Sequence, residues 1–164
     1  MSEIVPITEV TVGQCKGFSC GQELLDEYLK RYAKGNHRKG VGKTFVVLLE
    51  QHVVGFYTLS MGNIEFNSVP KSYQVGLPKY PIPIGRIGRL AVDSRQKGRG
   101  LGKFLLTSAL HKIWDASQIV AAYGVVVDAK NSEAVTFYQH FGFIPFENQS
   151  LSLFLPLASL RECF

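Results

Sequence analysis

Cysteine is scarce in this sequence, and the few cysteines form no pattern. The 164 residues hold Cys15, Cys20 and Cys163, an odd number without the CxxC spacing of a metal site. The four histidines show no HExxH or other ligand spacing, so we expect no bound metal. A disulfide framework is excluded as well, and a chain of this length buries about two-thirds of its unfolded surface, enough to fold without one.

Long apolar runs are missing too. The longest, Ile119–Val127, is about half of the ~18–20 residues that a membrane span requires. Glu3 stands where a secretion signal carries its positive charges, and no apolar stretch follows it, so we expect no signal peptide. The sequence therefore predicts a protein that makes no use of a membrane and works in the cytoplasm, where its thiols stay reduced.

Acidic residues are outnumbered, because eighteen Lys and Arg face thirteen Asp and Glu for a net charge of +5. Thirteen of the eighteen cations lie in two segments, Lys30–Lys43 without any acid and Lys79–Lys103 with Asp93 alone. Each cluster can also be explained as a solvated surface that binds no ligand, and that interpretation stays open. Two clusters, one of them rich in glycine, favour anionic ligands.

The remaining composition, 46% hydrophobic and 19% charged, is that of an ordinary globular protein, and the length predicts one domain over residues 1–164. Apolar spacing and β-branched runs predict the elements. The expected helices are one with Leu25, Tyr28, Leu29 and Tyr32 on its apolar face, interrupted at Gly35, then Gly100–Ala116 and Asn131–His140. The expected strands are Ile4–Val10, Thr44–Glu50, Val53–Leu59, Ile84–Val92, Ala121–Val127, Phe143–Phe146 and Leu151–Leu155. Hairpins mixed with strand–helix–strand units indicate an α/β or α+β fold with a mixed sheet.

The most informative segment is the glycine-rich turn Arg95–Lys103, which lies between an expected strand and an expected helix. Glycine allows positive φ and lets the backbone approach a ligand closely. The N–H groups at the start of the following helix point outward, and the helix dipole favours an anion there. With Lys97, Arg99 and Lys103 beside it, the turn suits a pyrophosphate.

Two common phosphate motifs do not fit. A Walker A loop needs GxxxxGK[ST], but Gly98–Phe104 is one residue short and lacks the hydroxyl, and Gly42–Thr44 has His37 where the first glycine belongs. A Rossmann GxGxxG would have Lys103 in place of its third glycine, and no acidic residue follows ~20 positions later. Neither an NTPase nor a dinucleotide enzyme fits this sequence.

An acyl-CoA motif does fit. Arg95–Gly100 matches [Q/R]xxGx[G/A], and Asn131–Phe143 matches NxxAxxFYxxxGF. The two motifs, in this order, resemble those of the GNAT superfamily of N-acetyltransferases. The resemblance implies a GNAT fold of the α+β class, with a central mixed, mostly antiparallel sheet flanked by helices. It also implies acetyl-CoA as the cosubstrate.

Residues Phe18–Leu157 resemble in particular the GNAT toxins of bacterial toxin–antitoxin pairs. The likeness lies in short segments, among them Phe18–Gly21, Leu25–Leu29, Pro81–Pro83, Gly88–Asp93 and Leu155–Leu157. Members of that group acetylate the α-amine of aminoacyl-tRNA, block translation and are neutralised by a ribbon-helix-helix antitoxin. The resemblance implies the same activity and partner here, and it allows a homodimer, since dimers are frequent in the group.

The resemblance also implies a set of cofactor-binding residues. The turn would bind the CoA pyrophosphate, and the strand before it would offer backbone N–H and C=O groups to the pantetheine arm, with one N–H at the thioester oxygen. Asn131 could bond the same arm, or serve only as a helix cap. The candidates are Leu90, Ala91, Val92, Lys97, Gly98, Arg99, Gly100, Leu101, Gly102, Lys103 and Asn131.

Tyr138, in the FY position of the second motif, is the candidate catalytic residue. Its phenol, with an ordinary pKa of about 10, would give a proton to the leaving CoA thiolate, whose thiol has a pKa of about 8.5. The alternative is a core aromatic beside Phe137 and Phe141. No strong general base is evident, and Glu133 and Asp128 are weak candidates. An α-amine with a pKa of about 8, lowered further by esterification of its carboxyl, is already partly neutral.

The first basic cluster is then expected to bind nucleic acid, because phosphate contacts supply most of the affinity for it. The candidate tRNA-binding residues are Lys30, Arg31, Lys34, Arg38, Lys39, Arg86 and Arg89. Binding of an acidic antitoxin tail by the same charges is an alternative. Two other functions stay open: a GNAT acetyltransferase of a protein N-terminus or small amine, and a non-catalytic module that binds CoA or nucleic acid. Tyr138 and the intact turn argue against the second.

Overall fold

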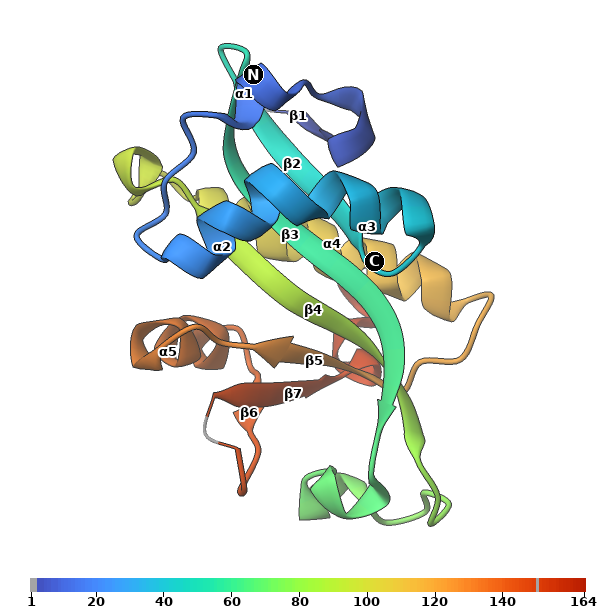
Figure 1. Cartoon of the computed structure of the whole chain (residues 1–164). Helices are drawn as coiled ribbons and strands as arrows, with labels where there is room; N and C mark the ends of the chain where they lie inside the picture. Colours follow the sequence, from blue (N-terminus) through green and yellow to red (C-terminus); the bar gives the residue numbers. More distant parts are fainter. Residues whose placement is uncertain (1–2, 150) are drawn as a thin grey trace. The chain divides into compact units, whose positions relative to one another are not determined.

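The structure is a computed structural model that describes residues 3–149 and 151–164. Over these residues seven strands form one sheet in the order β1-β2-β3-β4-β5-β7-β6 (Figure 1). The pairs β1–β2, β2–β3, β5–β7 and β6–β7 are antiparallel, whereas β4–β5 is parallel. The prediction of an α+β fold with a mixed, mostly antiparallel sheet is therefore confirmed.

The elements divide between two compact units, Met1–Ser60 with Gly88–Ala109, and Met61–Ile87 with Leu110–Phe164. The strands are β1 (Glu3–Pro6), β2 (Lys43–Leu49), β3 (His52–Ile64), β4 (Ile82–Val92), β5 (Gly124–Asp128), β6 (Ile144–Pro145) and β7 (Ser152–Pro156). The helices are α1 (Val12–Cys15), α2 (Glu23–Glu27), α3 (Ala33–Lys39), α4 (Leu101–Ser117) and α5 (Ser132–His140). No helix among the described residues is long and apolar enough to cross a membrane.

The first unit is built on the hairpin of β2 and β3, which the sequence predicted. The two strands pair from Lys43 opposite Leu59 to Leu49 opposite His52. The turn between them is made by Glu50 and Gln51, both with positive φ, at 50° and 67°. Positive φ at both central residues is typical of the turns whose twist matches that of a hairpin. The first strand is shorter than expected, because β1 ends at Pro6 and the chain then forms a 3-10 turn.

A single helical segment, α2 to α3, lies along β2 and β3 (Figure 1). The predicted interruption at Gly35 is wrong: the helix runs on through Gly35 to Lys39 and ends at Gly40, whose φ of 77° is left-handed. An exposed glycine costs a helix only about 1 kcal/mol, which packing elsewhere along the segment outweighs. The predicted apolar face is wrong at Tyr32, which is 50% exposed. A π-helical turn at Tyr28–Tyr32 contains one residue more than an α-helical turn. The next buried position after Leu29 is therefore Ala33 instead of Tyr32.

The second unit has β5 between β4 and β7. An added Cβ at Gly85 of β4 would lie 2.6 Å from the Ile113 side chain, so α4 packs closely on this strand because of the glycine. Helix α5 begins and ends as predicted. Asn131 caps it by accepting a hydrogen bond from the Ala134 N–H (2.9 Å), and Gly142, with φ of 94°, follows it.

Candidate active site

The glycine turn opens at the end of β4, as predicted. Ser94–Gln96 forms one 3-10 turn, residues 97–100 are exposed, and α4 starts at Leu101. Gly98 and Gly100 have φ of 81° and 78°, a left-handed conformation that side chains disfavour. An added Cβ at either glycine would meet nothing within 4 Å, so the backbone of the turn is open to an approaching ligand.

The turn has the charge that a diphosphate needs. The first N–H groups of a helix lack partners within the helix, and the dipole adds partial positive charge there. Lys97, Arg99 and Lys103 are exposed at this helix start, and Arg99 Nη1 donates a hydrogen bond to Gln96 Oε1 (3.1 Å). The candidates from Lys97 to Lys103 thus form an exposed turn followed by the first residues of α4, where Leu101 and Gly102 are half-buried.

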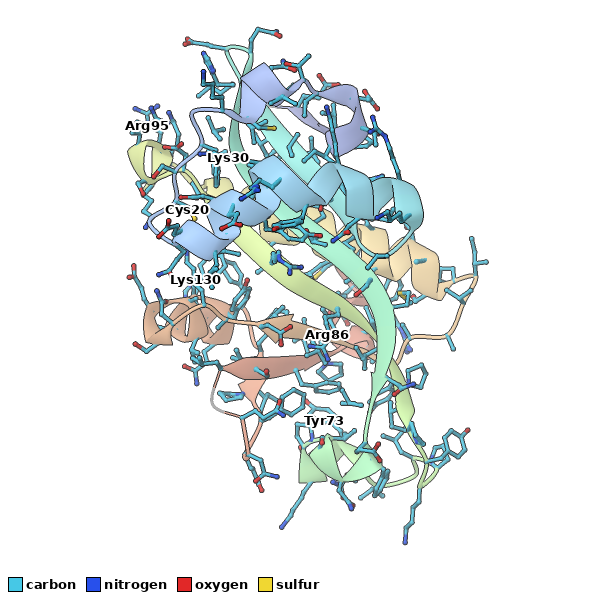
Figure 2. All side chains as sticks on the ribbon, viewed as in Figure 1. Cys20, Lys30, Tyr73, Arg86, Arg95 and Lys130 are labelled. Carbon is cyan, nitrogen blue, oxygen red and sulfur yellow. The ribbon has the colours of Figure 1, made fainter. Side chains whose placement is uncertain are left out.

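The arginine that opens the motif has another role, which sequence reasoning missed. The Asp93 carboxylate is 1% exposed and accepts hydrogen bonds from the Arg95 side chain (Nε 2.9 Å, Nη2 2.8 Å), the Arg95 N–H (2.9 Å) and the Ser19 N–H (3.1 Å). These bonds, those of the Arg95 side chain above all, lower the pKa of Asp93 to about 2. Arg95 Nη2 also donates to the Gly17 carbonyl (2.7 Å). Arg95, at the turn beyond β4 in Figure 2, therefore ties the motif to residues 17–19.

The residues predicted to contact the pantetheine arm lie at the end of β4. The pairing of β4 with β5 covers Ile84–Ile87, and β4 continues beyond it to Val92. The Asp93 N–H donates to the Val54 carbonyl of β3 (2.8 Å). Because backbone groups alternate in direction along a strand, those of Leu90 and Val92 point to the opposite edge from β3. Binding of the pantetheine arm by Leu90, Ala91 and Val92 stays a prediction. The backbone groups of Leu90 and Val92 are the best oriented for it.

The basic residues of the first cluster lie on the α2–α3 helical segment, except Lys43, which begins β2. All of them except the half-buried Lys34 are exposed, and Figure 2 shows Lys30 on the outer side of the helix. Arg89 of β4 joins the segment from beneath, because its guanidinium stacks on the ring of Tyr28, 3.6 Å from the ring centre. The first unit therefore brings Arg89 together with the helix that carries Lys30, Arg31, Lys34, Arg38 and Lys39.

The catalytic candidate, Tyr138, lies on α5 of the second unit. It is 3% exposed and packs edge-on against Phe137 and Phe143. Burial, and next the charge of Asp128, raise the pKa of Tyr138 well above its ordinary value. Both effects keep the phenol protonated, so Tyr138 can act as a proton donor and not as a base.

Arg86, the remaining candidate for tRNA, lies in the second unit and is already paired. Its Nη1 donates to both oxygens of Asp128 (3.0 and 2.9 Å), and Ser152 Oγ donates to Asp128 Oδ1 (3.2 Å). Neither side chain of the pair is buried, with 34% of Arg86 and 41% of Asp128 exposed. Sequence reasoning missed this network, because its three members come from three different strands.

A metal site was not expected. Among residues 3–149 and 151–164, no three His, Cys, Asp or Glu side chains are grouped in a way that could hold a metal ion.

The amino-acid sequence matches a known protein family. The model of the acetyltransferase (GNAT) domain matches residues 40–145, and the chain belongs to this family. The chain is 35% identical over 144 residues, 88% of this chain and 86% of the relative, to the tRNA-acetylating toxin of Mycobacterium tuberculosis.

Two solved structures of the toxin AtaT resemble the chain along its whole length. AtaT complexed with acetyl-methionyl-tRNAfMet has a TM-score of 0.91 and 32% identity, covering 100% of this chain and 99% of that one. A tyrosine-to-phenylalanine mutant of AtaT, bound to acetyl-CoA and the C-terminus of the antitoxin AtaR, has a TM-score of 0.82 and 28% identity, covering 100% and 98%.

Proposed function

We propose that this protein is an acetyl-CoA-dependent N-acetyltransferase that acetylates the α-amine of aminoacyl-tRNA and so acts as a translation-blocking toxin. The observation that carries the proposal is the 32% identity along the whole chain with AtaT, a toxin whose structure holds an acetylated aminoacyl-tRNA. The glycine turn at the start of α4 supports the cosubstrate, and the AtaT mutant structure with acetyl-CoA supports it too.

The reaction begins with a neutral α-amine, whose lone pair attacks the carbonyl carbon of the acetyl thioester. The new C–N bond forms and the C–S bond breaks, so the electron pair leaves on the CoA sulfur. Tyr138 gives the thiolate its phenolic proton, the surplus proton of the amine passes to water, and water returns a proton to the Tyr138 phenolate. The apolar surroundings that raise the pKa of Tyr138 also raise that of a thiol beside it, which makes the thiolate a better proton acceptor.

The other candidates serve binding in this proposal. The turn from Lys97 to Lys103 binds the CoA pyrophosphate, and a backbone N–H at the end of β4 stabilises the oxyanion. Asn131, whose side chain caps α5, bonds the pantetheine arm with its remaining donor capacity. The cations of the α2–α3 segment, with Arg89 and Arg86, bind the tRNA backbone.

The proposal extends to partners and place of action. A small antitoxin with a ribbon-helix-helix domain neutralises the protein, supported by the antitoxin bound to AtaT. The protein acts in the cytoplasm, where charged tRNA is, as one catalytic domain over residues 1–164, and it forms a homodimer.

Radiolabelled acetyl-CoA, offered to the protein with a pool of charged tRNA, tests the proposal. We expect label in the RNA fraction, lost after mild alkaline cleavage of the aminoacyl ester. Label on peptides or polyamines instead would favour the second candidate, a GNAT enzyme for another amine. CoA binding without any transfer would indicate a non-catalytic module.

A further inference from the structure

Arg89 of β4 is a half-buried cation that forms no ion pair with any of the described residues. Arg86 and Arg95 each bond a carboxylate, whereas the side chain of Arg89 contacts the ring of Tyr28 and gives no hydrogen bond to a described residue. Taking a cation out of water is costly unless a partner replaces the water. A half-buried guanidinium whose donors meet no protein acceptor is therefore suited to an anionic ligand.

Tyr28 fixes the plane of this guanidinium. Arg89 Cζ lies 3.6 Å from the centre of the Tyr28 ring, a separation so short that the two planes must be stacked. The ring is itself held, because Tyr28 is 7% exposed and its Oη accepts a hydrogen bond from Asn36 Nδ2 (3.3 Å). One face of the guanidinium is thus covered, while its N–H groups point outward in its own plane. A planar fork held in one orientation can bond two oxygens of a phosphate at once.

Arg89 also lies next to the backbone that is proposed to hold the thioester. It directly precedes Leu90, and residues of a strand are ~3.3 Å apart along its axis. Side chains alternate between the faces of a strand, so Ala91 lies on the same face as Arg89. Ala91 is buried in one apolar cluster with Tyr28 and Leu29 of the helical segment. The guanidinium therefore lies where the basic helical segment meets the reacting end of β4.

This position favours one phosphate of the proposed substrate. The amino acid of a charged tRNA is esterified to the ribose of the last nucleotide, so the phosphate of that nucleotide is the one nearest to the α-amine. An error of about 1 Å in placing a reacting group can lower the rate about 10²-fold. A rigid contact to the nearest phosphate therefore affects the rate of acetyl transfer and not the affinity alone.

We propose that Arg89, oriented by Tyr28, bonds the phosphate of the 3′-terminal nucleotide with two N–H groups and so fixes the aminoacyl ester opposite the acetyl thioester. The inference rests on the proposed function and names the substrate group that Arg89 recognises. Tyr28 is a positioning residue, because it holds the guanidinium and does not touch the substrate. The contact uses only the charge and the oxygens of the phosphate, so it requires no particular base or amino-acid side chain.

Charged tRNA whose last phosphodiester is replaced by a neutral methylphosphonate tests this assignment. The reference is the same tRNA, unmodified, chosen as the charged tRNA that the wild type acetylates fastest. We expect the methylphosphonate to lower kcat/KM of the wild type about 10- to 100-fold, the effect of losing hydrogen bonds between charged groups. Arg89→Gln lowers kcat/KM for the unmodified tRNA by a similar factor and makes the protein indifferent to the methylphosphonate, because both changes remove the same contact.

Arg161→Gln is the matched control for the loss of one positive charge. Arg161 is an exposed arginine near the C-terminus, to which no binding role is assigned. We expect this variant to keep both the wild-type kcat/KM for unmodified tRNA and the full effect of the methylphosphonate. The KM for acetyl-CoA is expected to stay the same in all three proteins.

Two variants of Tyr28 separate positioning from a merely structural role. Tyr28→Phe keeps the ring and most of the methylphosphonate effect, whereas Tyr28→Leu keeps an apolar side chain, releases the guanidinium and makes the effect smaller. A structural loss alone lowers the rate with both tRNAs alike and leaves their ratio unchanged, so an unchanged ratio in Tyr28→Leu overturns the role of Tyr28. A methylphosphonate effect that is absent from the wild type, or as large in Arg89→Gln, overturns the assignment of Arg89. A wild type that acetylates no charged tRNA overturns the proposed function itself.

Discussion

Replacing Asp93 by asparagine tests the brace between the glycine turn and residues 17–19. The pKa of Asp93 is lowered from about 3.8 to about 2, and each unit corresponds to ~1.4 kcal/mol, so the ionised carboxylate contributes about 2 kcal/mol to folding. Arg95 stays hydrated after the change, because 69% of its side chain is exposed. The loss of folding free energy is therefore smaller than the ~3–5 kcal/mol that follows when one partner of a fully buried ion pair is removed. We expect Asp93→Asn to unfold about 2 kcal/mol more easily in urea at pH 7.

The pH dependence gives the sharper form of this prediction. A carboxylate whose pKa is lower in the folded than in the unfolded state stabilises the fold in full at a pH above its unfolded pKa. It loses that contribution as the pH falls through its folded pKa. The difference between wild type and Asp93→Asn is therefore constant above about pH 5 and shrinks between about pH 4 and pH 2. A difference below ~0.5 kcal/mol at pH 7, or one that persists unchanged at pH 2–3, would refute the reasoning. Asp115→Asn, the loss of an exposed carboxylate, is the control for general charge effects.

Three further predictions follow from the site. Tyr138→Phe keeps the ring but removes the proton donor, so single-turnover acetyl transfer falls about 10²- to 10⁴-fold while acetyl-CoA binding by calorimetry is unchanged; an unaltered rate contradicts the assignment. Gly98→Ala places a side chain at φ of 81°, a strain of ~1–2 kcal/mol, and raises the KM for acetyl-CoA, whereas the same change at the exposed helical Gly35 does not. Lys34→Glu lowers tRNA affinity in filter binding and flattens its salt dependence; a salt slope equal to the wild type's argues against the helix as the tRNA surface.

The sequence predicted those parts of the molecule that are decided by short-range rules. The β2–β3 hairpin follows from two β-branched runs a few residues apart, and α5 follows from a cap at Asn131 and a glycine stop at Gly142. The glycine turn could be placed because positive φ at Gly98 is a local requirement.

The parts that the sequence did not predict depend on contacts between distant residues. Arg95 was recognised as the first residue of a motif, but its bond to the Gly17 carbonyl joins positions 78 residues apart. The pair of Arg86 and Asp128, 42 residues apart, is likewise invisible in a single sequence. The helix through Gly35 was missed because its stability comes from packing, which propensity does not record.

The activity that we propose for the protein is transfer of an acetyl group from acetyl-CoA to the amine of an aminoacyl-tRNA. The most direct measurement is mass spectrometry of the aminoacyl-adenosine released by nuclease digestion of charged tRNA, after incubation with the protein and acetyl-CoA. We expect the aminoacyl-adenosine to gain the mass of one acetyl group with the wild type and to stay unmodified with Tyr138→Phe. Unmodified aminoacyl-adenosine from every charged tRNA, with a protein that binds acetyl-CoA, would contradict the claim.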